Sequence, residues 1–338
     1  MRNGEGNLGS DAPPPDQGSV LVTGGAGYIG SHVCKALAAA GFSPVAFDDL
    51  SRGHDWAVKW GPLVRGNLLD RQALLGALDE YRPASIIHLA GFTYVGESVR
   101  APLLYYQNNI AGSLCLLECA ADRGIGALVF SSSAAVYGDP LSIPIDEDHR
   151  LAPINPYGFT KVVVERFLHD AEAAGGLRSI SLRYFNAAGA DPDGEAGEAH
   201  DPETHLIPLV LTAARTGTSL TIFGADYDTP DGTCIRDYIH VSDLADAHVR
   251  SLRALLAGGP TRALNLGTGA GLSVREIIAA AETVTGKKIP VQFGPRRPGD
   301  PPRLVSDPGL ALRELDWRPS HSDIGTIVET AWRWMNRS

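Results

Sequence analysis

Three residue types at a defined spacing point to the oxidation of an alcohol. Tyr157 and Lys161 are four residues apart, so a helix would place both side chains on one face. A free tyrosine has a pKa near 10, and a nearby ammonium group would favour the phenolate, which can accept a proton. Ser133 closes a run of three serines after an apolar stretch, where its hydroxyl could hydrogen-bond the reacting oxygen and relay the proton. The pattern indicates that a hydroxyl proton passes to Tyr157 while hydride leaves the same carbon.

A hydride acceptor is predicted by a glycine pattern near the start of the chain. Gly24, Gly27 and Gly30 follow the apolar run 19–23 and open a helical stretch over 28–40. Glycine permits the tight turn, the close approach of the backbone to a pyrophosphate, and the close packing of helix on strand. The unsatisfied N–H groups of the helix N-terminus would face the phosphates of a dinucleotide. The positive nicotinamide of that dinucleotide would also favour the phenolate of the catalytic tyrosine.

The acid after the second predicted strand favours NAD over NADP. Asp48 lies 18 residues after Gly30, where a carboxylate accepts hydrogen bonds from ribose hydroxyls and repels a 2′-phosphate. Asp49 beside it adds to the repulsion. Arg52 is the counter-argument, because arginine can bind a 2′-phosphate.

Apolar runs alternate with helical stretches along the first half of the chain. The predicted strands are 19–23, 44–48, 62–66, 85–89, 127–130 and 179–184. The predicted helices are 28–40, 70–80, 103–123 and 158–174. This alternation predicts an α/β fold with a doubly wound parallel sheet of the Rossmann kind.

The second half of the chain has a different character. Residues 188–203 are rich in Gly, Asp, Glu and Pro, and 290–308 is rich in Pro, Gly and Arg. We expect a disordered tail over 1–17, an NAD-binding Rossmann domain over 18–187, and a smaller, loop-rich substrate domain over 188–338. Short strands at 237–240 and 264–266 predict that the chain returns to the first domain near 234–266.

The composition excludes several classes of partner. A net charge of −10 argues against nucleic acid and against an anionic membrane. No apolar run approaches the ~20 residues needed to span a bilayer, and residues 1–17 lack the apolar segment of a secretory signal. The four cysteines form no CxxC pair and no zinc spacing, so we expect no metal and a reducing, cytoplasmic location.

The order of longer motifs carries a family resemblance. The segments are TGGAGYIGSH, HLAG, VGESV, YYQNN, FSSSAAVYGD, PINPYGFTK, LRYFNAAGA, IFGADYDTPDGTCIRDYIHVSDLADAH, NLGTG and RRPGD. Together they resemble the UDP-glucose 4-epimerase family of the extended short-chain dehydrogenase/reductases, from about Val20 to Trp334. VGESVRAPLLYYQNN and DPETHLIPLVL are most similar to bacterial exopolysaccharide-type epimerases and to UDP-arabinose 4-epimerases.

The resemblance implies a role for each matching residue. Ser133, Tyr157 and Lys161 match the catalytic set. The cofactor-binding residues that it implies are Gly24, Gly27, Tyr28, Ile29, Gly30, Asp48, Asn67, Leu68, Leu89, Ala90, Asn108, Tyr157, Lys161, Tyr184 and Phe185. The implied substrate-binding residues, with Ser133, are Asn186, His205, Leu206, Phe223, Arg236, Arg297, Asp300 and Leu304.

Four positions depart from the family pattern. Thr93 stands where many members have a lysine, which removes a cationic contact near the cofactor, and Asn67 replaces an acid that contacts adenine. His205 replaces a common asparagine beside the sugar nucleotide. Leu304 is intermediate in size at a position bordering the 2-substituent of the sugar, which leaves substrate breadth open.

The activity that the resemblance implies is the interconversion of UDP-glucose and UDP-galactose through a 4-keto intermediate, with tightly bound NAD. UDP-xylose/UDP-arabinose and UDP-N-acetylglucosamine are alternative substrates. A sugar-nucleotide 4,6-dehydratase shares the first hydride step but needs an acid and base after the serine, where this chain has Ala134 and Ala135. A redox-sensing binding module without activity would not require Tyr157 or Lys161. The resemblance also implies a homodimer joined by the helices near 103–123 and 158–174.

Overall fold

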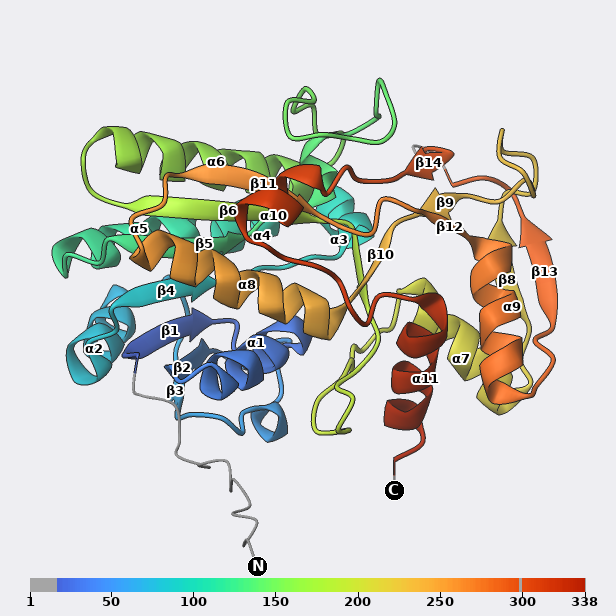
Figure 1. The fold of residues 1–338 in the computed structure, drawn as a ribbon, viewed down its shortest axis with the longest axis horizontal. Coiled ribbons are helices and arrows are strands. Elements are labelled where there is room, and N and C mark those ends of the chain that lie inside the picture. The colour runs from blue at the N-terminus through green and yellow to red at the C-terminus, as the bar shows by residue number, and fades with distance from the viewer. Residues whose placement is uncertain (1–16, 298–299, 338) are drawn as a thin grey trace, which may run out of the picture.

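A parallel sheet of seven strands forms the larger part of the structure (Figure 1). The computed structural model describes residues 17–297 and 300–337. In spatial order the strands are β11 (Arg262–Leu266), β6 (Arg178–Tyr184), β5 (Ala127–Ser131), β4 (Ser85–His88), β1 (Ser19–Thr23), β2 (Ser43–Asp48) and β3 (Leu63–Arg65). Every neighbouring pair is parallel, so the predicted doubly wound α/β sheet is confirmed.

Two apolar cores cover the two faces of this sheet. Val20 and Val22 of β1 point into one core and Leu21 into the other, and all three side chains are fully buried, as expected for a strand between two helical layers. The first core includes residues of α1 (Tyr28–Ala39), α8 (Val241–Leu256) and α10 (Gly309–Glu314). The second includes residues of α2 (Arg71–Tyr81), α5 (Gly112–Asp122) and α6 (Pro156–Ala173), among them Cys119.

The predicted helix over 103–123 is divided in the structure. A short α3 (Val95–Arg100) precedes α4 (Pro102–Tyr105), which leads through the π-helical turn η2 (Tyr106–Ala111) into α5. The turn contains Asn109, whose Oδ1 accepts a hydrogen bond from the N–H of Phe92 at 2.8 Å and whose Nδ2 donates to the Phe92 carbonyl at 2.9 Å. The irregular turn thereby fixes the loop that follows β4.

A smaller part of the structure lies beside the large sheet and has its own core (Figure 1). Its helices are α7 (Leu206–Thr216), α9 (Val274–Thr285) and α11 (Ile324–Met335). Its short strands pair as β8 (Leu220–Phe223) with β13 (Val291–Gly294), β7 (Asn186–Ala188) with β10 (Tyr238–His240), and β9 (Ile235–Arg236) with β12 (Leu272–Ser273) and β14 (Arg303–Leu304). Two single turns of 3-10 helix, η1 (Asp55–Ala57) and η3 (Ala134–Val136), lie in loops after strands of the large sheet.

The chain crosses between the two parts more than once. Strand β11 and helix α8 follow residue 187 yet belong to the large sheet and its core. The domain limits at 187 and 188 stay a prediction. The predicted disordered tail lies outside the described residues except for Gln17. No helix in the described ranges is long and apolar enough to cross a membrane.

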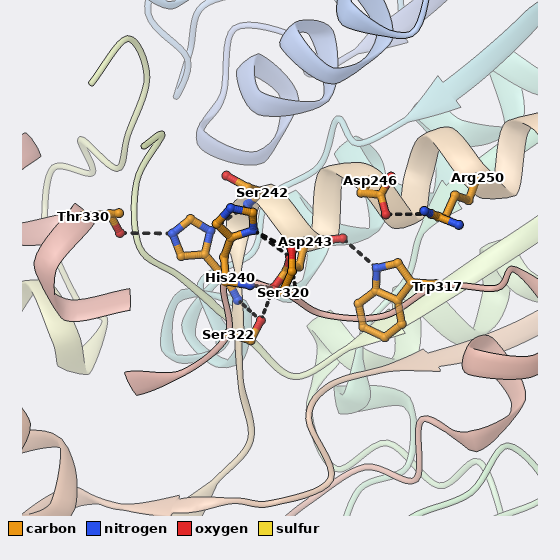
Figure 2. A network of polar contacts seen from close by, with 10 residues as sticks. His240, Ser242, Asp243, Asp246, Arg250, Trp317, Ser320, Ser322 and Thr330 are labelled. Atoms are coloured by element: carbon orange, nitrogen blue, oxygen red, sulfur yellow. Dashed lines mark hydrogen bonds and ion pairs between the residues drawn. The ribbon is translucent and has the colours of Figure 1, made fainter. Parts of the chain in front are cut away.

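A buried aspartate ties α8 to the segment that leads into α11 (Figure 2). Asp243, in the first turn of α8, is 3% exposed. Its carboxylate accepts hydrogen bonds from the N–H groups of Ser320 and His321, at 2.9 and 2.8 Å, and from the Ser322 hydroxyl at 2.6 Å. Burial alone would raise the pKa of Asp243, but these hydrogen bonds outweigh it and hold the pKa below its ordinary value.

We expect Asp243→Ala to lower the free energy of unfolding by about 2–4 kcal/mol, because two N–H groups and a hydroxyl lose a buried, charged acceptor. The control is Asp246→Ala on the same helix, whose carboxylate pairs with Arg250 in a half-exposed ion pair and should contribute less than about 1 kcal/mol. Denaturant unfolding at neutral pH measures both. Because the pKa of Asp243 is depressed, the difference from wild type should shrink as the pH falls below 3.8. Equal losses in the two variants would contradict this role for Asp243.

Candidate active site

A cavity of about 540 Å³ opens at the carboxyl ends of the central strands and extends to the smaller part. It collects most of the side chains expected to bind cofactor and substrate. The predicted residues that line it are Gly24, Gly27, Tyr28, Ile29, Gly30, Asp48, Asn67, Leu68, Leu89, Ala90, Asn108, Ser133, Tyr157, Tyr184, Phe185, Asn186, His205, Arg236, Asp300 and Leu304. Two distant parts of the chain therefore form one cavity.

The glycine turn has no room for side chains at two positions. A Cβ on Gly30 would lie 2.0 Å from the carbonyl oxygen of Gly24, and Gly24 itself has a φ of +75°. This close approach brings the start of α1 against the end of β1. The first turn of α1 has no acidic side chain and no side-chain cap, so its N–H groups remain available to an anion. The turn fits the diphosphate of a dinucleotide.

Asp48 lies beside this turn with its carboxylate fixed. One oxygen accepts a hydrogen bond from the N–H of Ala26 at 3.0 Å, and the other accepts from the N–H of Leu50 at 2.9 Å. Burial raises the pKa of Asp48, and these hydrogen bonds oppose that rise. The fixed carboxylate is placed to accept hydrogen bonds from the ribose hydroxyls of a dinucleotide. Asn67, at the same end of the cavity, donates to Asp49 at 2.7 Å.

Tyr157 and Lys161 lie in the first turns of α6, as predicted. The helix begins at Pro156, and the Asn155 side chain accepts a hydrogen bond from the Gly158 N–H at 2.8 Å, which fixes the start of the helix. Lys161 is 5% exposed and does not line the cavity. Its ammonium donates to the Ser131 carbonyl at 2.7 Å and lies 5.7 Å from the centroid of the Tyr157 ring.

The expectation that the Lys161 ammonium favours the phenolate of Tyr157 stays a prediction. Burial raises the pKa of Tyr157, and only a hydrogen bond with Ser133 opposes the rise. Burial also lowers the pKa of Lys161 to about 8, with the charge of Glu165 opposing that change. The ammonium donates to the Ser131 carbonyl, and an oxidised nicotinamide bound in the cavity would add a positive charge that favours the phenolate.

The three serines after β5 hold three different groups. The Ser131 hydroxyl lies 2.8 Å from the Tyr184 hydroxyl, and the Ser132 hydroxyl donates to Glu165 at 2.5 Å. Glu165 in turn forms a buried ion pair with Arg183 at 2.6 Å. Ser133 is left to face the cavity, where its Oγ accepts a hydrogen bond from the N–H at 135. Ser131 and Ser132 therefore position neighbouring side chains.

The far end of the cavity carries the second set of predicted residues. Arg236 pairs with Asp300, and Leu304 lies next to Arg236 in the pairing of β14 with β9. The side-chain amide of Asn186 donates to the carbonyl of Asp237 at 2.9 Å.

Three predicted substrate residues, Leu206, Phe223 and Arg297, do not line the cavity. The guanidinium carbon of Arg297 lies 4.2 Å from the centroid of the Phe223 ring, so these two side chains pack on one another. Leu206 begins α7 and packs against the core of the smaller part.

Sequence reasoning missed several residues that also line the cavity: His54, Trp56, Phe92, Tyr94, Glu97, Glu198 and His200. All belong to loops or to short helical segments after strands. No periodicity marks such positions. The signal that was available is their place after strand ends, where ligand contacts gather in α/β folds.

Two groups of side chains have the chemistry of metal ligands. Glu198, His200, Glu203 and His205 bring their ligand atoms within 4.8 Å of one another. A carboxylate oxygen of Glu198 lies 2.8 Å from the Nδ1 of His200 and 2.6 Å from that of His205. Burial lowers the pKa of His205, but Glu198 and Glu203 outweigh this effect and raise the pKa to about 10. A second group, Asp191, Asp193 and Glu195, surrounds the ammonium of Lys35. Because the first group is paired internally and the second is paired with Lys35, we assign a metal to neither, and the expectation of no metal stays a prediction.

Known proteins with this geometry identify the family. A model of the NAD dependent epimerase/dehydratase family matches residues 20–267. The chain belongs to this family. A UDP-glucose 4-epimerase of Rhizobium leguminosarum bv. trifolii is 52% identical over 323 residues, which cover 95% of this chain and 98% of the relative.

Solved structures of epimerases have the same fold. The crystal structure of UDP-glucose 4-epimerase from Brucella ovis in complex with NAD has 50% identity and a TM-score of 0.91, covering 93% of this chain and 97% of that one. That of UDP-glucose-4-epimerase from Stenotrophomonas maltophila, with bound NAD and formylated UDP-arabinopyranose, has 40% identity and a TM-score of 0.91, covering 94% and 98%. The predicted resemblance to the NAD-dependent epimerases is confirmed.

Gly30→Ala tests the glycine turn of this epimerase. The new Cβ would meet the backbone oxygen of Gly24, so we expect the free energy of unfolding to fall by about 1–3 kcal/mol and the NAD content of the purified protein to fall. The control is Gly76→Ala within α2, where a Cβ meets nothing within 4 Å and should stabilise the helix by about 0.5–1 kcal/mol. Thermal unfolding and acid-released nucleotide give the two readouts. A Gly30→Ala protein with normal NAD content would show that the turn does not bind the cofactor.

Proposed function

We propose that the protein is an NAD-dependent UDP-glucose 4-epimerase that interconverts UDP-glucose and UDP-galactose. The observation that carries the proposal is the convergence of the glycine turn, Tyr157 and Ser133 on one cavity, with the Lys161 ammonium behind them. The relatives named UDP-glucose 4-epimerase match over nearly their whole length. Bound NAD supplies a reversible hydride acceptor.

Each catalytic residue has a distinct role in this proposal. The Tyr157 phenolate takes the proton of the hydroxyl on carbon 4 of the sugar while hydride leaves that carbon, and a 4-keto sugar results. Ser133 hydrogen-bonds the same oxygen. Lys161 supplies a positive charge close to the tyrosine ring and is held by the Ser131 carbonyl. When the proton and hydride return, the configuration at carbon 4 depends on which face of the sugar is presented.

The sugar must turn within the cavity, so the binding energy must come from the nucleotide. Arg236 lies at the end of the cavity away from the glycine turn, and a guanidinium is suited to grip a diphosphate. The hexose would then occupy the space between Arg236 and Tyr157 with few fixed contacts. Leu304 borders this end and leaves pentose and N-acetylated sugars as alternative substrates.

The hypothesis of a 4,6-dehydratase has less support than that of an epimerase. Ala134 and Ala135 line the cavity directly after Ser133, and neither can transfer the proton that loss of the hydroxyl on carbon 6 requires. The Stenotrophomonas epimerase structure contains formylated UDP-arabinopyranose, so a pentose sugar is the alternative substrate with more support.

Tyr157→Phe tests the proposal, because it removes one hydroxyl and leaves the ring that packs beside Lys161. We expect turnover of UDP-galactose to fall by about 10²–10⁴-fold with the NAD content unchanged. Product analysis should cover the UDP-glucose/UDP-galactose, UDP-xylose/UDP-arabinose and N-acetylated pairs. Wild-type protein that epimerises none of them, or a Tyr157→Phe variant with near-normal turnover, would refute the assignment.

We further propose a homodimer and a cytoplasmic location. Apolar side chains stand exposed along α3, α4, α5 and α6, notably Val99, Leu103, Leu114 and Phe159. A second copy packed helix to helix would cover them.

The dimer proposal predicts that Leu103→Glu yields monomers, because Leu103 is 76% exposed on this face and a buried charge is costly. Leu141→Glu is the control, since Leu141 is 74% exposed in a loop outside these helices. Light scattering at micromolar concentration should give dimer mass for wild type and for the control. Monomer mass for wild type would refute the dimer.

A further inference from the structure

An ion pair joins the loops that follow β2 and β4. Arg52 Nη2 lies 2.9 and 3.1 Å from the two carboxylate oxygens of Glu97 in α3. The guanidinium also lies 5.4 Å from the ring centroid of Phe92 and 5.3 Å from that of Tyr94. All four residues line the cavity, and the two charged side chains are 39% and 27% exposed. We call this contact the Arg52–Glu97 clasp.

The clasp spans the glycine turn. In the sheet, β1 lies between β4 and β2, so a contact between the loops after β4 and β2 passes the end of β1 where the turn begins. The chain next to Arg52 packs on the turn itself. The N–H of His54 donates to the Ala26 carbonyl at 2.9 Å, and a Cβ on Gly53 would lie 2.9 Å from the Ala26 carbonyl carbon.

The cavity lining has few cations for the ligands that it must hold. Among the described residues, Arg52 and Arg236 are the only lysine or arginine side chains that line it. Arg236 lies at the sugar-nucleotide end and pairs with Asp300. NAD and a UDP-sugar each carry a diphosphate, so each arginine is a candidate partner for one of them. Thr93, between Phe92 and Tyr94, supplies no charge at the cofactor end.

Arg52 keeps donors available while it is clasped. Glu97 engages Nη2, and the remaining guanidinium N–H groups have no protein acceptor among residues 17–297 and 300–337. The residues around Arg52 are themselves held in place. Asn109 hydrogen-bonds both the N–H and the carbonyl of Phe92, and the Tyr105 hydroxyl donates to Glu97 at 2.9 Å. Half-exposed ion pairs are weak, so the clasp can open to admit a ligand.

We propose that Arg52 binds the diphosphate of NAD and that the Arg52–Glu97 clasp closes over the bound cofactor and slows its release. The inference rests on the proposed function, since it takes NAD as the resident cofactor. Binding of a 2′-phosphate by Arg52 is the competing role. The carboxylate of Asp48, fixed by two backbone N–H groups at the same loop, opposes that role by charge repulsion.

The test measures NAD release from purified holoenzyme, by exchange against an excess of isotope-labelled NAD. Arg52→Gln should release NAD about 10-fold faster or more, as expected when a hydrogen bond to a charged group is lost. Arg52→Lys keeps the charge and should fall between Arg52→Gln and wild type. Glu97→Gln weakens the clasp but keeps the arginine, so its release should be faster than wild type and slower than Arg52→Gln. Arg100→Gln, at an exposed position of α3, is the control and should match wild type.

Each outcome decides between roles. Unchanged NAD release in Arg52→Gln would overturn the proposal, as would a loss confined to the binding of NADP. Slower release in Glu97→Gln would overturn the clasp, because it would mean that Glu97 competes with the cofactor for Arg52. If Arg52→Gln does not fold, faster release in Arg52→Lys and Glu97→Gln supports the clasp, and unchanged release in both overturns it. Acid release of NADP, or of no dinucleotide, from wild type would instead refute the proposed function.

Discussion

The close approach of α1 to the glycine turn is the constraint on which the site depends. With no Cβ at Gly30, the helix begins against the end of β1, and its N-terminal N–H groups open into the cavity. The same placement brings Tyr28 within reach of the smaller part, where its hydroxyl donates to the Gly189 carbonyl at 2.7 Å. A residue expected to touch the cofactor is thereby joined to the part that holds the substrate. The size of one side chain therefore affects both ends of the cavity.

Behind the cavity, polar groups are buried but paired. The Lys161 ammonium has the Ser131 carbonyl and two aromatic rings, and Glu165 has Arg183 and the Ser132 hydroxyl. Such groups are costly to bury alone, and a fully paired network permits few arrangements. The consequence is a rigid wall behind Tyr157. The ion pair between Arg52 and Glu97, which also lines the cavity, is by contrast partly exposed to water.

The sequence predicts best where the signal is local. The central strands, the glycine turn and the start of α6 follow from short apolar runs, close glycine spacing and the Asn155–Pro156 helix start. Arg52 and Glu97 are 45 residues apart, and their pairing depends on sheet order, which no short pattern contains. The role of Asp243 is likewise not visible in the sequence, because its hydrogen-bond partners at 320–322 lie far along the chain. Predicted positions such as Phe223 lie outside the cavity because tertiary packing pairs them elsewhere.

The π-helical turn over 106–111 has a consequence for how this helix tolerates insertions and deletions. A π turn is geometrically an α-helix with one extra residue. Deleting one residue there would restore regular hydrogen bonding and keep the helix faces on either side in register, but it would remove the widened turn that contains Asn109. Asn109 would then leave the Phe92 backbone, and the loop after β4 would lose its support. In this helix, a change in length would alter the cavity more than most substitutions would.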